Sequence, residues 1–311
     1  MIPAGARIFS AKTVVRLAGI AFLLCWSGAT ALAEDVPLTP QVAELIREGD
    51  MEDARANTKA ALVYFEQADK LSPERVAILL RISKQYMDLV GETNPPGEAA
   101  ARSSLEYAQR AVDLDPKCAK AHLALAVGYG RMTDFTDNKT KLLYSKYVKD
   151  ETEKSIALDP TDAYAYHVLG RWNYCVASLN PMLKLMAKYV YGGLPEASME
   201  DAAKYLKKST ELAPQRIIHR FELARTYKAM GKTDLATKEW ETILALHAAS
   251  KEEETAQKTA REELKAIPAY ERSAPSTTSG LTASNTQPAR KQSPPIGVIA
   301  PSQGTPDAAS R

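Results

Sequence analysis

The stretch that decides the fold runs from residue 217 to residue 246 and reads IIHRFELARTYKAMGKTDLATKEWETILAL. Its apolar residues recur at intervals of three and four, which is the spacing of one face of an α-helix. Gly231 separates two such faces and marks a turn. The faces are formed by Leu223, Ala224 and Tyr227, and by Ala236, Trp240 and Ile243. The stretch therefore predicts a hairpin of two helices.

The spacing within this hairpin is that of the 34-residue tetratricopeptide repeat. Counted from Ile217 as the first position, the seven residues occupy positions 7, 8, 11, 15, 20, 24 and 27 of that pattern. Small residues at positions 8 and 20 allow two helices to approach closely, and the large residues fill the space between them. A hairpin of this kind cannot bury its apolar face alone, so the pattern predicts a stack of similar units.

Similar helix endings recur upstream of this stretch. In each one, apolar residues at helical spacing lead into a proline, which cannot continue a helix. The intervals between successive prolines are 43, 44 and 54 residues. The prolines are Pro73, Pro116, Pro160 and Pro214. Four such endings at this spacing indicate repeated helical hairpins.

Counting from these prolines places first helices at Val76, Ala119 and Ala163, and an earlier hairpin formed by residues 41–47 and 61–68. We therefore predict an all-α chain, a tetratricopeptide-like α-α superhelix of about five helical hairpins. Three connections, at residues 91–97, 133–139 and 180–198, are longer than the usual turn of the repeat. The last contains apolar residues at helical spacing, which predict an extra helical insertion. That helix either packs on the stack, covers a ligand or contacts a membrane.

The two ends of the chain have a different composition. Residues 1–33 contain Arg7, Lys12 and Arg16, an apolar run from Leu17 to Trp26, and small residues up to Ala33, which is the order of a secretory signal peptide. We expect cleavage after Ala33. Residues 34–267 form the repeat domain, and residues 268–311 form a Ser/Thr/Pro-rich tail that we predict to be disordered.

The predicted cleavage site changes the net charge. The whole chain has 40 Lys and Arg against 38 Asp and Glu, and the first 33 residues contain three basic and no acidic side chains. Residues 34–311 therefore carry a net charge of −1. A chain without excess positive charge is not expected to bind nucleic acid, because that affinity depends on phosphate neutralisation.

The sequence offers no motif for catalysis. A glycine-rich phosphate loop, a G-x-S-x-G elbow, an H-E-x-x-H pair and a paired C-x-x-C are all absent. His219 and Glu222 share a helical face, but a metal site needs at least three converging ligands. Cys118 and Cys175 fall on different units, too far apart for a disulfide. We predict neither an enzyme nor a cofactor or metal protein.

The first helices of stacked hairpins line a concave groove, into which repeat positions 2, 5, 9, 12 and 13 point. These positions combine cations with aromatic rings, which suits a partner with an acidic segment and apolar anchors. Ordinary solvated charges would give the same pattern. The predicted groove residues are Lys84, Arg131, Tyr164, His167, Arg171, Tyr174, Phe221, Arg225 and Lys228.

Two further segments carry a family resemblance. Residues 167–174 read HVLGRWNY and residues 191–198 read YGGLPEAS, and both precede the hairpin at 217–246. Together they resemble the regulator of microtubule dynamics family over about residues 71–267. The resemblance implies a tetratricopeptide-like domain. Because animal members are associated with microtubules, and one with organelle contacts and lipid, it also adds microtubules as an alternative partner.

These observations favour an exported, non-enzymatic scaffold that binds a protein or peptide in its groove. The bacterial periplasm is the compartment that we favour, and a secretory lumen or an organelle anchor in a eukaryote is the alternative. A lipid or apolar-ligand carrier, with residues 180–198 as a lid, is a second functional class. Microtubule association in the cytosol would require that residues 1–33 are not a secretion signal.

Overall fold

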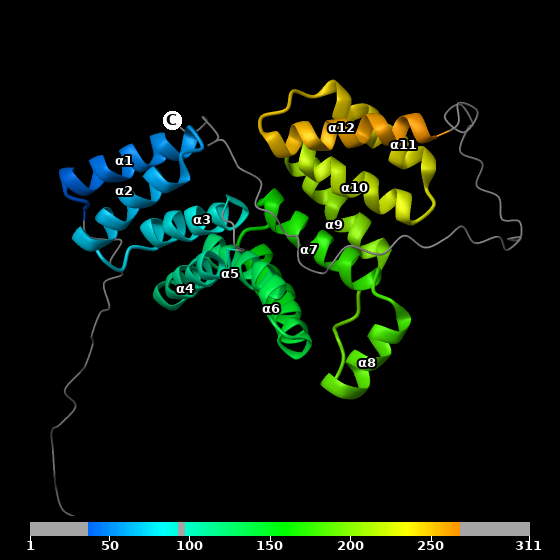
Figure 1. Ribbon diagram of the computed structural model, residues 1–311, viewed down its shortest axis with the longest axis horizontal. Helices are drawn as coiled ribbons and strands as arrows, with labels where there is room; N and C mark the ends of the chain where they lie inside the picture. Colours follow the sequence, from blue (N-terminus) through cyan, green and yellow to red (C-terminus); the bar gives the residue numbers. More distant parts are fainter. Residues whose placement is uncertain (1–36, 93–96, 268–311) are drawn as a thin grey trace, which may run out of the picture. The chain divides into compact units, whose positions relative to one another are not determined.

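The computed structural model describes residues 37–92 and 97–267, and these ranges contain twelve α-helices and no strand (Figure 1). A short 3₁₀ turn, η2 (Thr133–Phe135), follows the fifth helix. The helices are α1 (Pro40–Ala54), α2 (Thr58–Leu71), α3 (Val76–Glu92), α4 (Glu98–Leu114), α5 (Ala119–Met132), α6 (Asn138–Leu158), α7 (Ala163–Ala177), α8 (Pro181–Tyr191), α9 (Met199–Leu212), α10 (Ile217–Ala229), α11 (Thr233–Ala245) and α12 (Lys251–Ala266).

The helices pair into the five predicted hairpins. α1 packs on α2, α3 on α4, α5 on α6, α7 on α9, and α10 on α11, and each hairpin contacts the next. α8 is the predicted helical insertion, since it lies between the two helices of the fourth hairpin. The all-α tetratricopeptide-like architecture is therefore confirmed.

The proline endings act as expected. α2, α4, α6 and α9 each end two residues before one of the four prolines. The residue before a proline is restricted to extended backbone, so a helix ends at or before it. Among the helices that follow, α7 begins at a side-chain cap, where the Asp162 carboxylate accepts the backbone N–H groups of Tyr164 and Ala165.

Small residues bring the helices of a hairpin together. A Cβ atom built on Gly170 of α7 would lie 2.6 Å from Cγ of Leu206 on α9, so this packing requires glycine. Ser83 of α3 and Ser104 of α4 make a polar version of the same approach. Each of these hydroxyls donates to the backbone carbonyl of the other serine at 2.8 Å. Both arrangements follow from a small residue at repeat position 8.

The core continues from one hairpin to the next. Leu223, Trp240 and Ile243, which the sequence placed on the inner faces of the last hairpin, are each at most 1% exposed. A larger cluster joins α3 to α7 through residues that include Trp172, whose indole N–H donates to the carbonyl of Ser145 on α6 at 2.7 Å. That hydrogen bond and the surrounding apolar contacts join the third and fourth hairpins.

Two of the long connections contain more helix than the sequence suggested. α3 continues through Gly91 to Glu92, and residues 93–96 lie outside the described part. α6 begins at Asn138 because the Asp137 carboxylate accepts the N–H groups of Lys139 and Thr140. The proposed cleavage site and the tail at 268–311 also lie outside the described residues.

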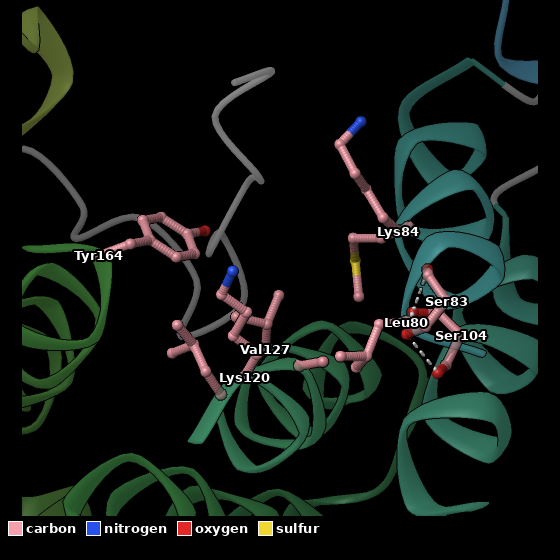
Figure 2. A pocket seen from close by; sticks show the side chains of 10 residues that line it. Leu80, Ser83, Lys84, Ser104, Lys120, Val127 and Tyr164 are labelled. Carbon is pink, nitrogen blue, oxygen red and sulfur yellow. Dashed lines mark hydrogen bonds between the residues drawn. The ribbon is translucent and has the colours of Figure 1, made fainter. Parts of the chain in front are cut away.

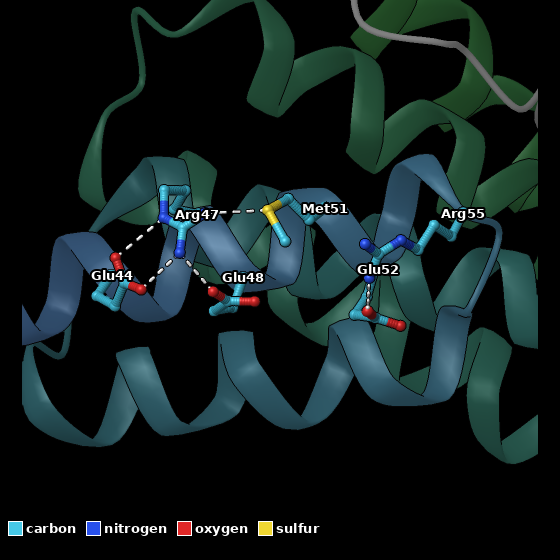
Figure 3. A network of polar contacts seen from close by, with 6 residues as sticks. All are labelled: Glu44, Arg47, Glu48, Met51, Glu52 and Arg55. Carbon is cyan, nitrogen blue, oxygen red and sulfur yellow. Dashed lines mark hydrogen bonds and ion pairs between the residues drawn. The ribbon is translucent and has the colours of Figure 1, made fainter.

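The first helix, α1, carries ion pairs on its surface. The exposed side of α1 carries ion pairs from Arg47 to Glu44 and Glu48, and from Arg55 to Glu52 (Figure 3). Pairs this exposed contribute little to stability.

α12, which the sequence analysis did not predict, packs on α10 and α11 and buries Ala256 and Ala260. No helix within the described ranges is both long and apolar enough to cross a bilayer.

We predict that Gly170→Ala lowers the free energy of unfolding by about 1–3 kcal/mol, because the new methyl group would collide with Leu206. Urea unfolding followed by circular dichroism measures the change. Gly91→Ala in α3 is the matched control, since a Cβ atom there has nothing within 4 Å. Alanine in a helix is about 0.5–1 kcal/mol better than glycine, so the control should be neutral or stabilising. Equal effects at both sites would contradict the packing argument.

Candidate interaction groove

The predicted groove residues lie on the first helices of the hairpins. Among these helices, α3 contacts α5 and α7 contacts α10. The structure separates the residues into two main groups. Lys84 and Tyr164 line a pocket, whereas Arg171, Tyr174, Phe221 and Arg225 surround a buried glutamate. His167, Arg131 and Lys228 lie outside both groups and have partners of their own.

The pocket has a volume of about 260 Å³ and takes its walls mainly from α3 and α5, with Tyr164 of α7 on a third side (Figure 2). Most of its walls are apolar. Seen in Figure 2, Tyr164 faces the α3 side chains across the space, and Lys120 and Val127 lie between them. The lining residues are Leu80, Ser83, Lys84, Met87, Ser104, Lys120, Leu123, Ala124, Val127 and Tyr164. We call this the α3–α5–α7 pocket.

Most lining residues occupy the repeat positions that the sequence assigned to the groove. Tyr164 and Lys120 are at position 2 of their units, Leu123 is at position 5, and Lys84 and Val127 are at position 9. The pocket is therefore where the first helices of three successive hairpins face one space. That a partner binds these residues stays a prediction.

The two lysines of the pocket differ in their surroundings. The Lys84 ammonium donates to the carboxylates of Asp53 at 2.7 Å and Asp88 at 2.9 Å. Burial alone would lower the pKa of Lys84, but these carboxylates outweigh it and raise that pKa. Lys120 is exposed. Of the two, Lys120 offers the more accessible positive charge to an incoming ligand.

Tyr164 brings a polar group into the apolar pocket. Its ring stacks on His167 with the centroids 5.5 Å apart, and its buried hydroxyl has no hydrogen-bond partner among the described residues. Burial raises the pKa of Tyr164, so the hydroxyl stays protonated. A buried hydroxyl without a partner is costly. A ligand that accepted a hydrogen bond from it would remove that cost.

The second group surrounds Glu222 of α10. Its carboxylate lies 2.6 Å from the Arg171 guanidinium of α7 and 3.1 Å from that of Arg225. The Glu222 side chain is 3% exposed, whereas those of Arg171 and Arg225 are 14% and 31% exposed. We call these three residues the Arg–Glu–Arg cluster. One buried carboxylate therefore neutralises part of the positive charge that was predicted to attract an acidic partner.

Aromatic rings cover one of the two arginines. The Arg225 guanidinium lies 5.3 Å from the ring centroid of Tyr174 and 5.9 Å from that of Phe221, within the range of cation–π attraction. Burial would lower the pKa of Arg225, but Glu222 and the other neighbours raise it. Tyr174 and Phe221, two predicted groove residues, thus hold a third, Arg225, in place.

His167, which the sequence placed in the predicted groove, is buried and only 2% exposed. Its Nδ1 atom is 3.1 Å from Nδ1 of His219 on α10, which is 3% exposed, so one ring donates and the other accepts. Burial lowers the pKa of both rings, that of His219 to about 3, and the nearby arginines lower them further. The two imidazoles are therefore neutral near pH 7 and join α7 to α10.

Arg131 and Lys228 pair with carboxylates on other elements. Arg131 lies 3.6 Å from Asp134 in the η2 turn, and Lys228 pairs with Glu263 of α12. α12 also places Glu252 near Arg171, and burial raises the pKa of Glu252 to about 7 although the arginine lowers it. Sequence reasoning missed the acidic partners on α12, because it did not predict that helix.

Residues 37–92 and 97–267 contain neither a candidate metal site nor a disulfide. No group of three or more His, Cys, Asp and Glu side chains within the described ranges could hold a metal ion. Cys118 and Cys175 are both free thiols.

Comparison with known sequences identifies relatives of this chain. A sequence model of regulator of microtubule dynamics protein 1-3 matches residues 45–268. Regulator of microtubule dynamics protein 1 of Bos taurus is 29% identical over 136 residues, which cover 44% of this chain and 43% of that protein. Protein 3 of Mus musculus is 27% identical over 209 residues, covering 66% of this chain and 43% of that protein. The chain thus matches less than half the length of either relative.

Comparison with solved structures supports the fold. The crystal structure of a thermophilic TPR protein from Thermus thermophilus matches with a TM-score of 0.54 and 17% identity, covering 71% of this chain and 99% of that one. At this identity the likeness concerns the tetratricopeptide fold alone.

We predict that Glu222→Gln lowers the free energy of unfolding by about 3 kcal/mol, because it leaves Arg171 and Arg225 without their shared carboxylate. Glu263→Gln is the matched control, since its partner Lys228 is largely exposed, and it should cost less than about 1 kcal/mol. Chemical denaturation of the two variants measures both values. A loss for Glu222→Gln no greater than the control's would show that the cluster is not structurally important.

The buried histidines predict a pH dependence of stability. Below about pH 6.5 the unfolded chain protonates both rings while the folded chain keeps them neutral, so the free energy of unfolding falls by up to about 1.4 kcal/mol per ring and pH unit. Glu252 acts oppositely: its raised pKa gives stability that is lost as the pH rises through about 7. Because the two effects oppose each other, the free energy of unfolding of each variant is measured at pH 5, 6 and 7 and compared with that of the unaltered chain.

His167→Asn/His219→Asn should flatten the fall in stability toward low pH, and Glu252→Gln should steepen it. The control is His247→Gln, which removes an exposed ring and should keep the original slope. Identical slopes in the double histidine variant and the unaltered chain would rule out the buried neutral pair.

Proposed function

The chain belongs to the regulator of microtubule dynamics family, and on that premise we propose that it is a non-enzymatic scaffold that binds a protein or peptide partner in its groove. The single observation that carries this proposal is the α3–α5–α7 pocket, where first helices of three hairpins surround one apolar space. Tetratricopeptide-like folds offer such surfaces to extended partners. The binding of the partner would be centred on this pocket.

The chemistry of the pocket defines the partner. An apolar side chain fits between Met87, Leu123 and Val127, which would remove it from water. An acidic group next to that side chain could pair with Lys120 and accept the hydrogen bond of Tyr164. The Arg–Glu–Arg cluster is less suited to this task, because Glu222 already neutralises part of its charge. A peptide with an apolar anchor and a neighbouring carboxylate is therefore the favoured ligand.

A lipid or another apolar ligand is a second candidate. The same apolar walls would accept an acyl chain, and the same Lys120 and Tyr164 would bind a negatively charged head group. The relatives' names add microtubules as a third partner to test, which co-sedimentation with polymerised tubulin would detect.

We also propose that residues 1–33 direct export and are removed. This rests on Arg7, Lys12 and Arg16 followed by the apolar run and by Ala31, Leu32 and Ala33. A bacterial periplasm is the favoured destination. N-terminal sequencing of the secreted product should begin at Glu34; a chain that still begins at Met1 would contradict export by this route.

Filling the pocket tests the proposed function. Ala124 lines the pocket and is only partly buried, so Ala124→Phe would occupy the space without removing a core contact. Crosslinking and affinity capture from the native compartment should recover partners with the unaltered chain and about tenfold less of them with this variant. Ala99→Phe on the exposed side of α4 is the matched control and should behave like the unaltered chain.

The outcome also separates the candidates. Native mass spectrometry that finds lipid in the unaltered chain, and none in Ala124→Phe, would favour the carrier. If Ala124→Phe captured the same partners at the same level, the pocket would not be the binding site.

A further inference from the structure

The insertion helix α8 presents its apolar side chains to solvent. Met182 is 64% exposed, Leu183 53%, Leu185 50% and Tyr189 80%, and Tyr189 is the most exposed large apolar side chain among the described residues. A helix that simply covered the stack would show the reverse. α8 therefore has an apolar surface that the described part of the chain does not cover.

Three of the four exposed side chains share one face of the helix, and Leu183 lies outside that face. At 3.6 residues per turn, Met182, Leu185 and Tyr189 lie above one another, and Ala187 lies on the opposite side. Ala187 is 6% exposed, so that opposite side is turned toward the protein, where the packing neighbour of α8 is α6. The helix is thus oriented with its apolar face outward.

Both ends of α8 are fixed by local interactions. The Asn180 side chain accepts the backbone N–H of Met182, and Gly192, with a φ of 77°, ends the helix in the left-handed conformation. These caps give the helix its shape without help from a partner. Its outward face is consequently available on a helix that is already formed.

Charge indicates which surface would cover this face. Residues 177–195 contain Lys184 and Lys188 and no acidic side chain. The two lysines are four residues apart, so they lie on the same side of the helix, between the apolar face and the side of Ala187. The Lys184 ammonium also donates to the backbone carbonyl of Ala177 at 2.8 Å. A second copy of α8 would bring these cations against one another. An anionic surface would instead pair with them.

We propose that α8 binds the interface of an anionic lipid bilayer, with Met182, Leu185 and Tyr189 inserted among the acyl chains and Lys184 and Lys188 beside lipid phosphates. A helix of 11 residues is about 16 Å long, which suits lying in the interface and not crossing it. Tyrosine is favoured at this depth, because its ring is apolar and its hydroxyl remains hydrated. This inference does not depend on what the α3–α5–α7 pocket binds.

Vesicle sedimentation with the full chain tests the proposal. The chain should bind phosphatidylcholine vesicles that contain phosphatidylglycerol and bind pure phosphatidylcholine vesicles less. Met182→Ser/Leu185→Ser/Tyr189→Ser should reduce binding to the anionic vesicles by about tenfold or more, since three apolar side chains no longer leave water. Lys184→Glu/Lys188→Glu should reduce binding to the anionic vesicles alone.

The control substitutes three apolar residues that are similarly exposed elsewhere, in Val63→Ser/Leu71→Ser/Leu158→Ser, and should bind like the unaltered chain. Circular dichroism checks that each variant is folded. Tyr189→Trp supplies an independent reading, because its added fluorescence should shift to shorter wavelength with anionic vesicles. The α8 variants retain residues 1–33, so any vesicle binding through that segment would persist in them.

Equal vesicle binding by the unaltered chain and the α8 triple variant would overturn the proposal. So would a dimer in size-exclusion chromatography that only the α8 triple variant abolishes, without any vesicle binding, because a second copy would then cover the face. The Ala124→Phe variant should bind vesicles normally, which separates a failure here from a failure of the groove.

Discussion

Close approach of the two helices in each hairpin is the constraint on which the rest of the structure depends. At Gly170 the backbone of α7 lies so near Leu206 that even a methyl group would not fit. Ser83 and Ser104 permit a similar approach and satisfy their own hydroxyls in doing so. This proximity sets the direction of each first helix, and therefore which repeat positions face the α3–α5–α7 pocket. The close approach of the helices therefore determines both the apolar contacts that stabilise the stack and the residues that face the α3–α5–α7 pocket.

The junction of α7 and α10 shows that residues predicted to bind a partner can instead stabilise the fold. Arg171 and Arg225 share the carboxylate of Glu222, and His167 meets His219 one turn away. Charges placed together in a protein interior need such partners, since water no longer solvates them. The cationic stripe on these helices is consequently joined to the chain's own acids. The α3–α5–α7 pocket, with exposed Lys120 and the Tyr164 hydroxyl, keeps more of its polar capacity for other molecules.

The sequence predicted those features that depend on near neighbours along the chain. The prolines at 73, 116, 160 and 214 mark helix ends wherever they occur, and the small and large residues of 217–246 report a packing that every hairpin repeats. Partners across the stack leave no such local mark. Glu222 lies 51 residues from Arg171 along the chain, and the local sequence around neither residue predicts their contact. α12 was missed because it is strongly polar and its buried residues are only Glu253, Ala256 and Ala260, so no large apolar side chain marks its buried face in the sequence.

The position of α8 has a consequence for how such a chain can diversify. It enters between α7 and α9, yet these two helices pair as the helices of uninterrupted hairpins do. Lengthening a connection costs little conformational entropy once its ends are held together. The turn of a hairpin is therefore an acceptor point, where evolution or an engineer can graft a new element of about twenty residues while the supporting framework stays in register. Novelty in this architecture can arise by insertion at its corners, without rebuilding its interior.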